Sequence, residues 1–203
     1  MNSILRRRRA AMGAHKTSNV LFEWDYTEGV SNKIIDVGTI PSTMTQNGLL
    51  LESGTVAWSR ASIAPSISPL ASSYKATITY SDIVSLYSNS SVNFWHYNYE
   101  EKLVRLLRQK KYGTTTNFTK FINADSSASE VGWNLSDSGT IIIEYNSQNG
   151  TITFTQGANS YTGTITSPTS SSISTAIVSA QTGSNGAKAS VVIKHIKIER
   201  LQQ

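Results

Sequence analysis

Hydrophobic and polar residues alternate one by one along most of the chain after residue 18. A period of two is typical of β-strands with one buried face. The pattern is clearest in GTIIIEYNSQNGTITFTQGANSYTGTITS (139–167), where β-branched residues flank Asn149-Gly150 and a second turn near Gly157. Because such dipeptides readily form tight turns, we expect two successive hairpins there.

Seven further segments have strand character. They are NVLFEWDY (19–26), GLLLES (48–53), TVAWSR (55–60), SYKATITYSDI (73–83), SVNFWHYNY (91–99), SISTAIVSAQ (172–181) and ASVVIKHIKIERL (189–201). Many short strands without intervening helices predict an all-β fold, an antiparallel sandwich or barrel. The segment YEEKLVRLLRQKKY (99–112) consists of good helix formers but lies between strands, so helix and strand both stay open for it.

The chain divides into a short basic arm, residues 1–18, and one β-domain, residues 19–203. No Pro- or Ser-rich linker splits the second part, and a β-sandwich of this size is commonly a single domain. Cysteine is absent, which excludes a disulfide framework and thiolate metal sites. No run of 18 apolar residues predicts a membrane span, and the polar start does not resemble a secretory signal.

Charge separates the arm from the domain. The chain has 18 Lys+Arg and 13 Asp+Glu, a net charge of +5. Residues 1–16 hold five of the basic residues (Arg6, Arg7, Arg8, Arg9 and Lys16) and no acidic one, so removing them leaves 13 against 13. A neutral domain lacks the basic stripe that nucleic-acid binding requires, so we consider a nucleic-acid partner unlikely.

The arginine block of the arm predicts a docking segment. Guanidinium groups form bidentate pairs with carboxylates, and neighbouring arginines on an extended chain can contact two sides of a groove. We therefore expect Arg6–Arg9 and Lys16 to bind an acidic surface of another protein. Binding to phosphates, a transit peptide and a solvated tail are the alternatives.

The strands themselves resemble a known fold family. VLFEWDY, NGLLLES, SVNFWHYNY, IIIEYNSQNGTITFT and VVIKHIKIERL together look like a concanavalin-A-like or laminin-G-like jelly roll. The resemblance covers most of residues 19–203. It implies a jelly-roll β-sandwich in which the first and last strands pair and the concave face binds carbohydrate.

The opening LRRRRAAMGA resembles the starts of virion structural proteins of gut bacteriophages, including crAss-like phages. This resemblance implies a virion component, assembled in the host cytoplasm, that docks through its arm on other virion proteins. It also implies a homo-oligomer that displays the sandwich toward a host-surface carbohydrate. A carbohydrate-active jelly-roll enzyme or a free carbohydrate-binding module is the alternative.

A carboxylate motif tests the enzyme alternative. FEWDYTE contains Glu23, Asp25 and Glu28 and is similar to the E-x-D-x-x-E motif of jelly-roll endoglucanases. Retaining hydrolysis requires two carboxyl groups about 5–5.5 Å apart. In that family the motif lies on a central strand of the concave face, whereas here it lies on the first strand. We therefore predict a solvated strand edge, no catalytic residue and no enzyme activity.

Aromatic residues supply the other candidate site. Trp95, Tyr97 and Tyr99 share one face of the strand 91–99 and are either core residues or a platform on which a sugar ring stacks. The basic run Lys102–Lys111 is interpreted as a solvated face, with contact to an acidic partner as the alternative. The spacing of the three histidines matches no metal motif, so we expect no metal and no cofactor.

Overall fold

The computed structural model describes residues 19–29, 33–66, 73–97, 103–110, 112–123, 126–165 and 177–201, without the side chains of 95–97 and 103. Within these ranges the chain forms strands joined by turns and a single 3-10 turn, η1 (Tyr26–Glu28). The strands are β1 (Val20–Asp25), β2 (Ile34–Asp36), β3 (Thr43–Thr45), β4 (Gly48–Glu52), β5 (Arg60–Pro65), β6 (Tyr74–Ser85), β7 (Ser90–Tyr97), β8 (Leu103–Lys110), β9 (Asn117–Ile122), β10 (Ala128–Glu130), β11 (Gly139–Asn146), β12 (Thr151–Gln156), β13 (Asn159–Thr164), β14 (Val178–Thr182) and β15 (Ala189–Arg200).

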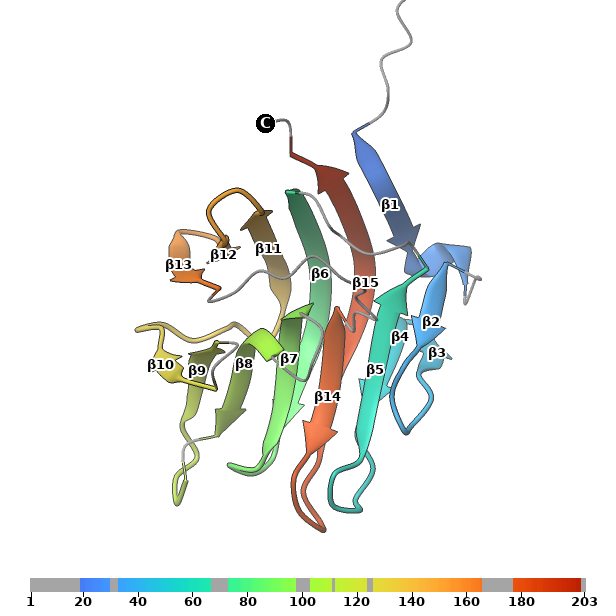
Figure 1. The fold of residues 1–203 in the computed structure, drawn as a ribbon. Coiled ribbons are helices and arrows are strands. Elements are labelled where there is room, and N and C mark those ends of the chain that lie inside the picture. Colours follow the sequence, from blue (N-terminus) through green and yellow to red (C-terminus); the bar gives the residue numbers. More distant parts are fainter. Residues whose placement is uncertain are drawn as a thin grey trace, which may run out of the picture.

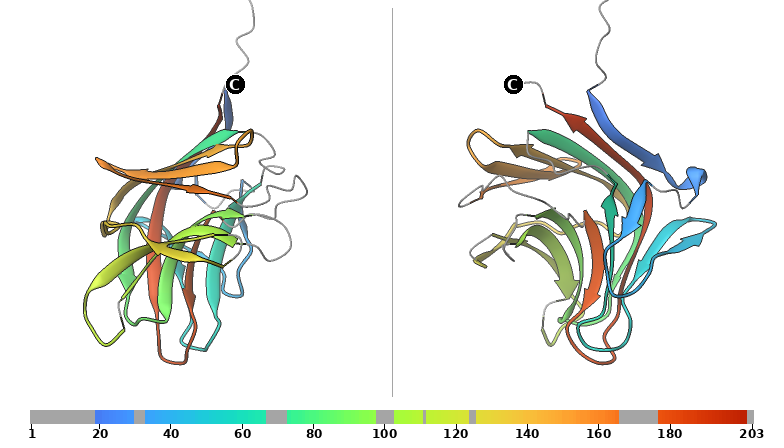
Figure 2. Two further views of the ribbon diagram at one scale, coloured as in Figure 1. Left: turned by 60° about the vertical axis from the view of Figure 1, so that its left-hand side comes forward. Right: turned by 45° about the vertical axis from the view of Figure 1, so that its right-hand side comes forward.

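Two antiparallel sheets pack face to face as a jelly-roll β-sandwich (Figure 1). Sheet A has eight strands in the order β13-β12-β11-β6-β15-β4-β3, with β1 also paired to β15. Sheet B has seven strands in the order β10-β9-β8-β7-β14-β5-β2. The two views of Figure 2 show the sheets as separate curved layers. The fold predicted from the alternation is therefore confirmed.

The first and last strands lie side by side, as the resemblance implied. Trp24 of β1 pairs with Ile196 of β15 in an antiparallel register. The Trp24 ring is fully buried, and its indole N–H donates to the carbonyl of Gly29 at 3.1 Å. Strand β15 is central in its sheet, because it also pairs along its length with β6 and β4.

One continuous core fills the space between the sheets. It is built from the alternate residues of the strands, for example Ile78, Ile141 and Ile196 of sheet A and Val92 and Phe94 of sheet B. The β11–β12 and β12–β13 hairpins form as predicted. Gly163 of β13 lies directly under the ring of Phe121 from sheet B, since a Cβ at this position would come within 2.5 Å of that ring.

Two sequence predictions need correction or completion. The expected strand 55–60 is wrong: residues 55–58 form a turn and β5 begins at Arg60, because Trp58 adopts a φ of 65° that a strand does not tolerate. The open segment 99–112 contains a strand, β8, where Val104 and Leu106 enter the core with period two. Pairing with both β7 and β9 overrides the helix propensity of its residues.

Candidate functional site

The carboxylates of FEWDYTE lie on the outer face of sheet A. Phe22 and Trp24 point into the core, so Glu23 and Asp25 point away from it. Glu23 Oε1 lies 3.2 Å from Nε2 of His195 on the neighbouring strand β15. Glu28 forms an ion pair with Lys33 at 2.7 Å.

Asp25 has a structural role as the cap of η1. Its side chain accepts hydrogen bonds from both the backbone N–H and the hydroxyl of Thr27, at 2.9 and 2.7 Å, and these bonds lower its pKa. The hydrogen bond from Lys33 likewise lowers the pKa of Glu28. A general acid needs the opposite, a raised pKa. The arrangement agrees with the prediction that this motif forms a strand edge and a turn.

The outer face of sheet B is more unusual, because small polar residues at its centre are buried. Ser62, Asn93 and Ser179 occupy neighbouring strands at one level and are each 0% exposed. The Asn93 amide donates to the hydroxyls of Ser91 and Ser179 at 3.2 and 3.3 Å. These residues alternate with core residues, so they belong to the side of sheet B that faces away from the core. We call Ser62, Ser91, Asn93 and Ser179 the polar row.

One hydroxyl of the polar row has no hydrogen-bond partner. Ser62 Oγ is buried and bonds to no protein group. An unsatisfied buried hydroxyl costs about 1–3 kcal/mol, so its retention in a folded protein calls for an explanation. A bound water in this buried layer would provide one.

Two arginines flank the polar row. Arg60 lies two residues before Ser62 on β5, and Arg105 lies on β8. Burial lowers the pKa of Arg105, and the positive charge of Arg60 adds to this effect. Lys120, which lies 4.8 Å over the Phe118 ring, is a third positive side chain on the described part of this face. Among the described residues, Glu130 of the edge strand β10 is the one carboxylate on the same face.

The predicted aromatic platform stays a prediction. The backbones of Trp95 and Tyr97 belong to β7. Their side chains, and the whole of Tyr99, lie outside the described residues.

The two remaining predicted sites are the arginine arm and the basic run Lys102–Lys111. Arg6–Arg9 and Lys16 of the arm lie outside the described residues. The interpretation of Lys102–Lys111 as a solvated face is wrong for Arg108. Arg105 is half-buried on the outer face, whereas Arg108 points between the sheets, where it is 5% exposed and forms an ion pair with Asp137. The reason is period two, which sends every second residue of β8 inward whatever its charge.

The part of the chain that the structure describes contains no cluster of three His, Asp or Glu residues placed to hold a metal ion. It also contains no helix with the length and hydropathy of a membrane span.

Sequence reasoning missed the polar row and Arg60. The available signal was the same alternation, because Ser62, Asn93 and Ser179 each stand between two core residues in their strands. From alternation alone, such polar residues are predicted to be exposed to solvent. Only the packing shows that they are buried.

Comparisons with known proteins support the fold. The structure is similar to the carbohydrate recognition domain of Emp47p, with a TM-score of 0.62 and 15% identity over 93% of this chain and 99% of that one. It is also similar to lectin II from Ulex europaeus (TM-score 0.56, 10% identity, 89% and 99% covered) and to the Crh5 transglycosylase (0.57, 11%, 89% and 84%). No family model matches the sequence, and no curated protein matches it either. The chain thus has a lectin-like, concanavalin-like jelly-roll fold, which both lectins and a transglycosylase share.

Proposed function

We propose that this protein binds glycans on the outer face of sheet B. The observation that supports the proposal is the polar row flanked by Arg60 and Arg105, on a lectin-like fold. Amide groups exchange hydrogen bonds with sugar hydroxyls, and the half-buried Gln181 supplies one beside Arg60, while the buried polar row forms the layer beneath them.

The charge of this face narrows the ligand to an acidic saccharide. Guanidinium groups bind carboxylate and phosphate groups in a bidentate manner, and the half-buried position of Arg60 strengthens such contacts by reducing their screening. Arg60 and its register partner Gln181 are both half-buried, so they are the accessible contacts beside the buried row. Uronic acids and phosphorylated sugars have the matching charge.

The proposal is tested by glycan-array binding of the full chain, followed by calorimetry with the best-bound acidic oligosaccharide. We expect Arg60→Gln to weaken binding by about tenfold or more, because one charge-assisted contact of this kind contributes about 1.5–3 kcal/mol. Lys197→Gln on the outer face of sheet A is the matched control, since it removes one positive charge from the opposite side, and it should leave the affinity unchanged. The proposal would be refuted if the array showed no binding of an acidic glycan, or if both variants lost the same amount of affinity.

We further propose that the arm attaches this glycan-binding sandwich to a larger particle, as in a phage virion. The support is the charge distribution, because the whole net charge of +5 belongs to residues 1–16 and the rest is neutral. Deleting residues 2–16 should leave glycan binding intact and abolish incorporation into particles, measured by co-sedimentation. Normal incorporation of the shortened protein would contradict the anchoring role.

The enzyme alternative has weaker support. A retaining glycosidase needs two carboxyl groups facing one sugar, and within the described residues the outer face of sheet B presents only Glu130. The carboxylates of FEWDYTE lie on the other sheet.

A further inference from the structure

Exposed apolar side chains gather at one end of the sandwich. The connections β4–β5, β6–β7, β8–β9 and β14–β15 all lie at the lower end in Figure 1, opposite the start of β1 and the end of β15. We call this the loop end. Seven large hydrophobic side chains are exposed among the described residues, and five of them belong to these connections: Val56, Trp58, Leu86, Tyr87 and Tyr112.

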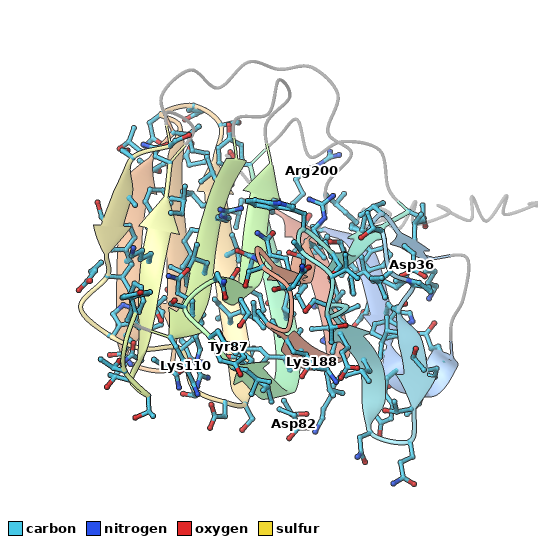
Figure 3. All side chains as sticks on the ribbon, turned by 90° about the horizontal axis from the view of Figure 1, so that it is seen from below. Asp36, Asp82, Tyr87, Lys110, Lys188 and Arg200 are labelled. Carbon is cyan, nitrogen blue, oxygen red and sulfur yellow. The ribbon has the colours of Figure 1, made fainter. Side chains whose placement is uncertain are left out.

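Hydrogen bonds between the loops hold this end in shape. The amide of Gly183 donates to the carbonyl of Asn89 at 2.7 Å, and that of Gly186 donates to the carbonyl of Thr55 at 2.7 Å. The amide of Leu86 donates to the carbonyl of Lys188 at 3.1 Å. The β14–β15 connection thus fixes the connections on both sides, and Figure 3 shows Tyr87 and Lys188 together at this end. The rings of Trp58 and Tyr87 are therefore presented by braced connections, which lowers the entropy cost of binding at Tyr87.

A cleft of about 560 Å³ lies between the β6–β7 and β8–β9 connections. Its lining comprises Leu86, Tyr87, Ser88, Tyr112, Gly113, Thr114 and Thr115. Tyr87 comes from one connection and Tyr112 from the other, and they are 56% and 89% exposed. A cleft of this volume is within the range of small-ligand sites, about 300–1,000 Å³.

The chemistry of the lining identifies the class of ligand. Among the residues that the structure describes, the lining contains two exposed phenol rings, three aliphatic hydroxyls and no charged side chain. Exposed rings stack on the C–H faces of a pyranose, and neutral hydroxyls exchange hydrogen bonds with its O–H groups. A charged peptide would find no counter-charge in the lining, and an apolar one would leave the hydroxyls unpaired.

We propose that the Tyr87–Tyr112 cleft is a second saccharide-binding site, specific for neutral sugars. It does not rest on the proposed function, because it uses other residues, another end of the molecule and a ligand of different charge. The two sites would allow the protein to hold two parts of one glycan, or two glycans.

The test uses the full chain on an array of neutral oligosaccharides, followed by calorimetry with the best-bound one. Tyr112→Ala and Tyr87→Ala should each weaken binding by about tenfold or more, since a lost ring contact of about 1.4 kcal/mol corresponds to tenfold. Tyr112→Phe keeps the ring and should retain most of the affinity. Circular dichroism checks that the variants fold, which we expect because both rings are exposed.

Two matched controls separate the alternatives. Trp58→Ala removes an exposed ring from the same end but outside the cleft, and it should leave the affinity within about twofold of the unchanged protein. Arg60→Gln, on the outer face of sheet B, should also leave neutral-sugar binding unchanged, so failure of one site does not imply failure of the other. The proposal is overturned if no neutral sugar is retained, or if Trp58→Ala costs as much as Tyr112→Ala. It is also overturned if the protein self-associates through this end and Tyr112→Ala restores the monomer.

Discussion

The two outer faces of the sandwich follow the same alternating pattern and yet differ in their relation to solvent. On sheet A many outward residues are threonines and charged side chains that stay at least partly exposed, such as Thr79 and Thr140, whose hydroxyls lie 3.1 Å apart. On sheet B the outward residues at the centre are the polar row, which is buried. The same alternation of polar residues therefore corresponds to solvent-exposed positions on sheet A and to buried positions at the centre of sheet B.

This difference supports the proposal that the outer face of sheet B is the binding face. A polar layer that is merely solvated needs no specific partners, and sheet A satisfies its charges with exposed ion pairs such as Lys75–Glu144. A buried polar layer is costly unless each group is satisfied, and Ser62 is not. Proteins retain such costs mainly where a ligand or a defined geometry requires them.

The largest effect on stability should come from removing the centre of the polar row. Asn93→Ala leaves the hydroxyls of Ser91 and Ser179 without their amide partner in a buried layer, so we expect a loss of about 1–3 kcal/mol in the free energy of unfolding. Thr79→Ala breaks a hydroxyl pair on sheet A and should cost less than about 1 kcal/mol. Urea unfolding of both variants measures the contrast. Equal losses would show that the two faces are energetically alike.

A smaller effect of opposite sign is expected at the neighbouring serine. Ser62→Ala deletes a hydroxyl that bonds to no protein group, so the free energy of unfolding should stay the same or rise by up to about 1 kcal/mol. Ser179→Ala removes an acceptor of the Asn93 amide and should be destabilising. A loss of stability at Ser62→Ala as large as at Ser179→Ala would mean that this hydroxyl has a partner in solution, such as water.

The smallest expected effect is on the acid stability of the protein and involves Asp25 of sheet A. The folded pKa of Asp25 lies below its ordinary value of 3.8, so its contribution is present above about pH 4 and is lost as the pH falls through the lower folded value. Asp25→Asn should therefore flatten the fall of the melting temperature in acid, while the neutral polar row contributes nothing to this slope. Calorimetric melting between pH 3 and about pH 6 is the measurement. Parallel curves for the two proteins would contradict the prediction.

Much of the fold could be predicted because its signals are local. The hairpin at Asn149-Gly150 is encoded by its turn residues, and the strand at 20–25 is encoded by alternation. The turn at Trp58 was missed because its backbone is fixed by distant residues, including Asn185, whose side chain accepts from the amide of Ala57 at 2.8 Å. The ion pair of Arg108 likewise depends on Asp137, 29 residues later.

The candidate sites were less predictable for a related reason. Stacking on aromatic residues was expected at Trp95 and Tyr97, where a run of rings stands out in the sequence. Tyr87 and Tyr112 are single rings in unremarkable loops, and only the fold brings them to opposite sides of one cleft. The exposure of a side chain depends on how the whole molecule packs, so a local sequence pattern does not predict that Tyr87 and Tyr112 are exposed.

The position of β15 has a consequence for how the protein is made. This strand is synthesised after all the other described strands, yet it pairs with β1, β4 and β6 and so completes the middle of sheet A. During synthesis on the ribosome, the backbone groups of β1, β4 and β6 that pair with β15 stay unpaired until residues 189–200 have emerged. The sequence separation of these contacts also predicts slow folding of the released chain. Premature termination near residue 188 would therefore yield an aggregation-prone chain and not a slightly shorter sandwich.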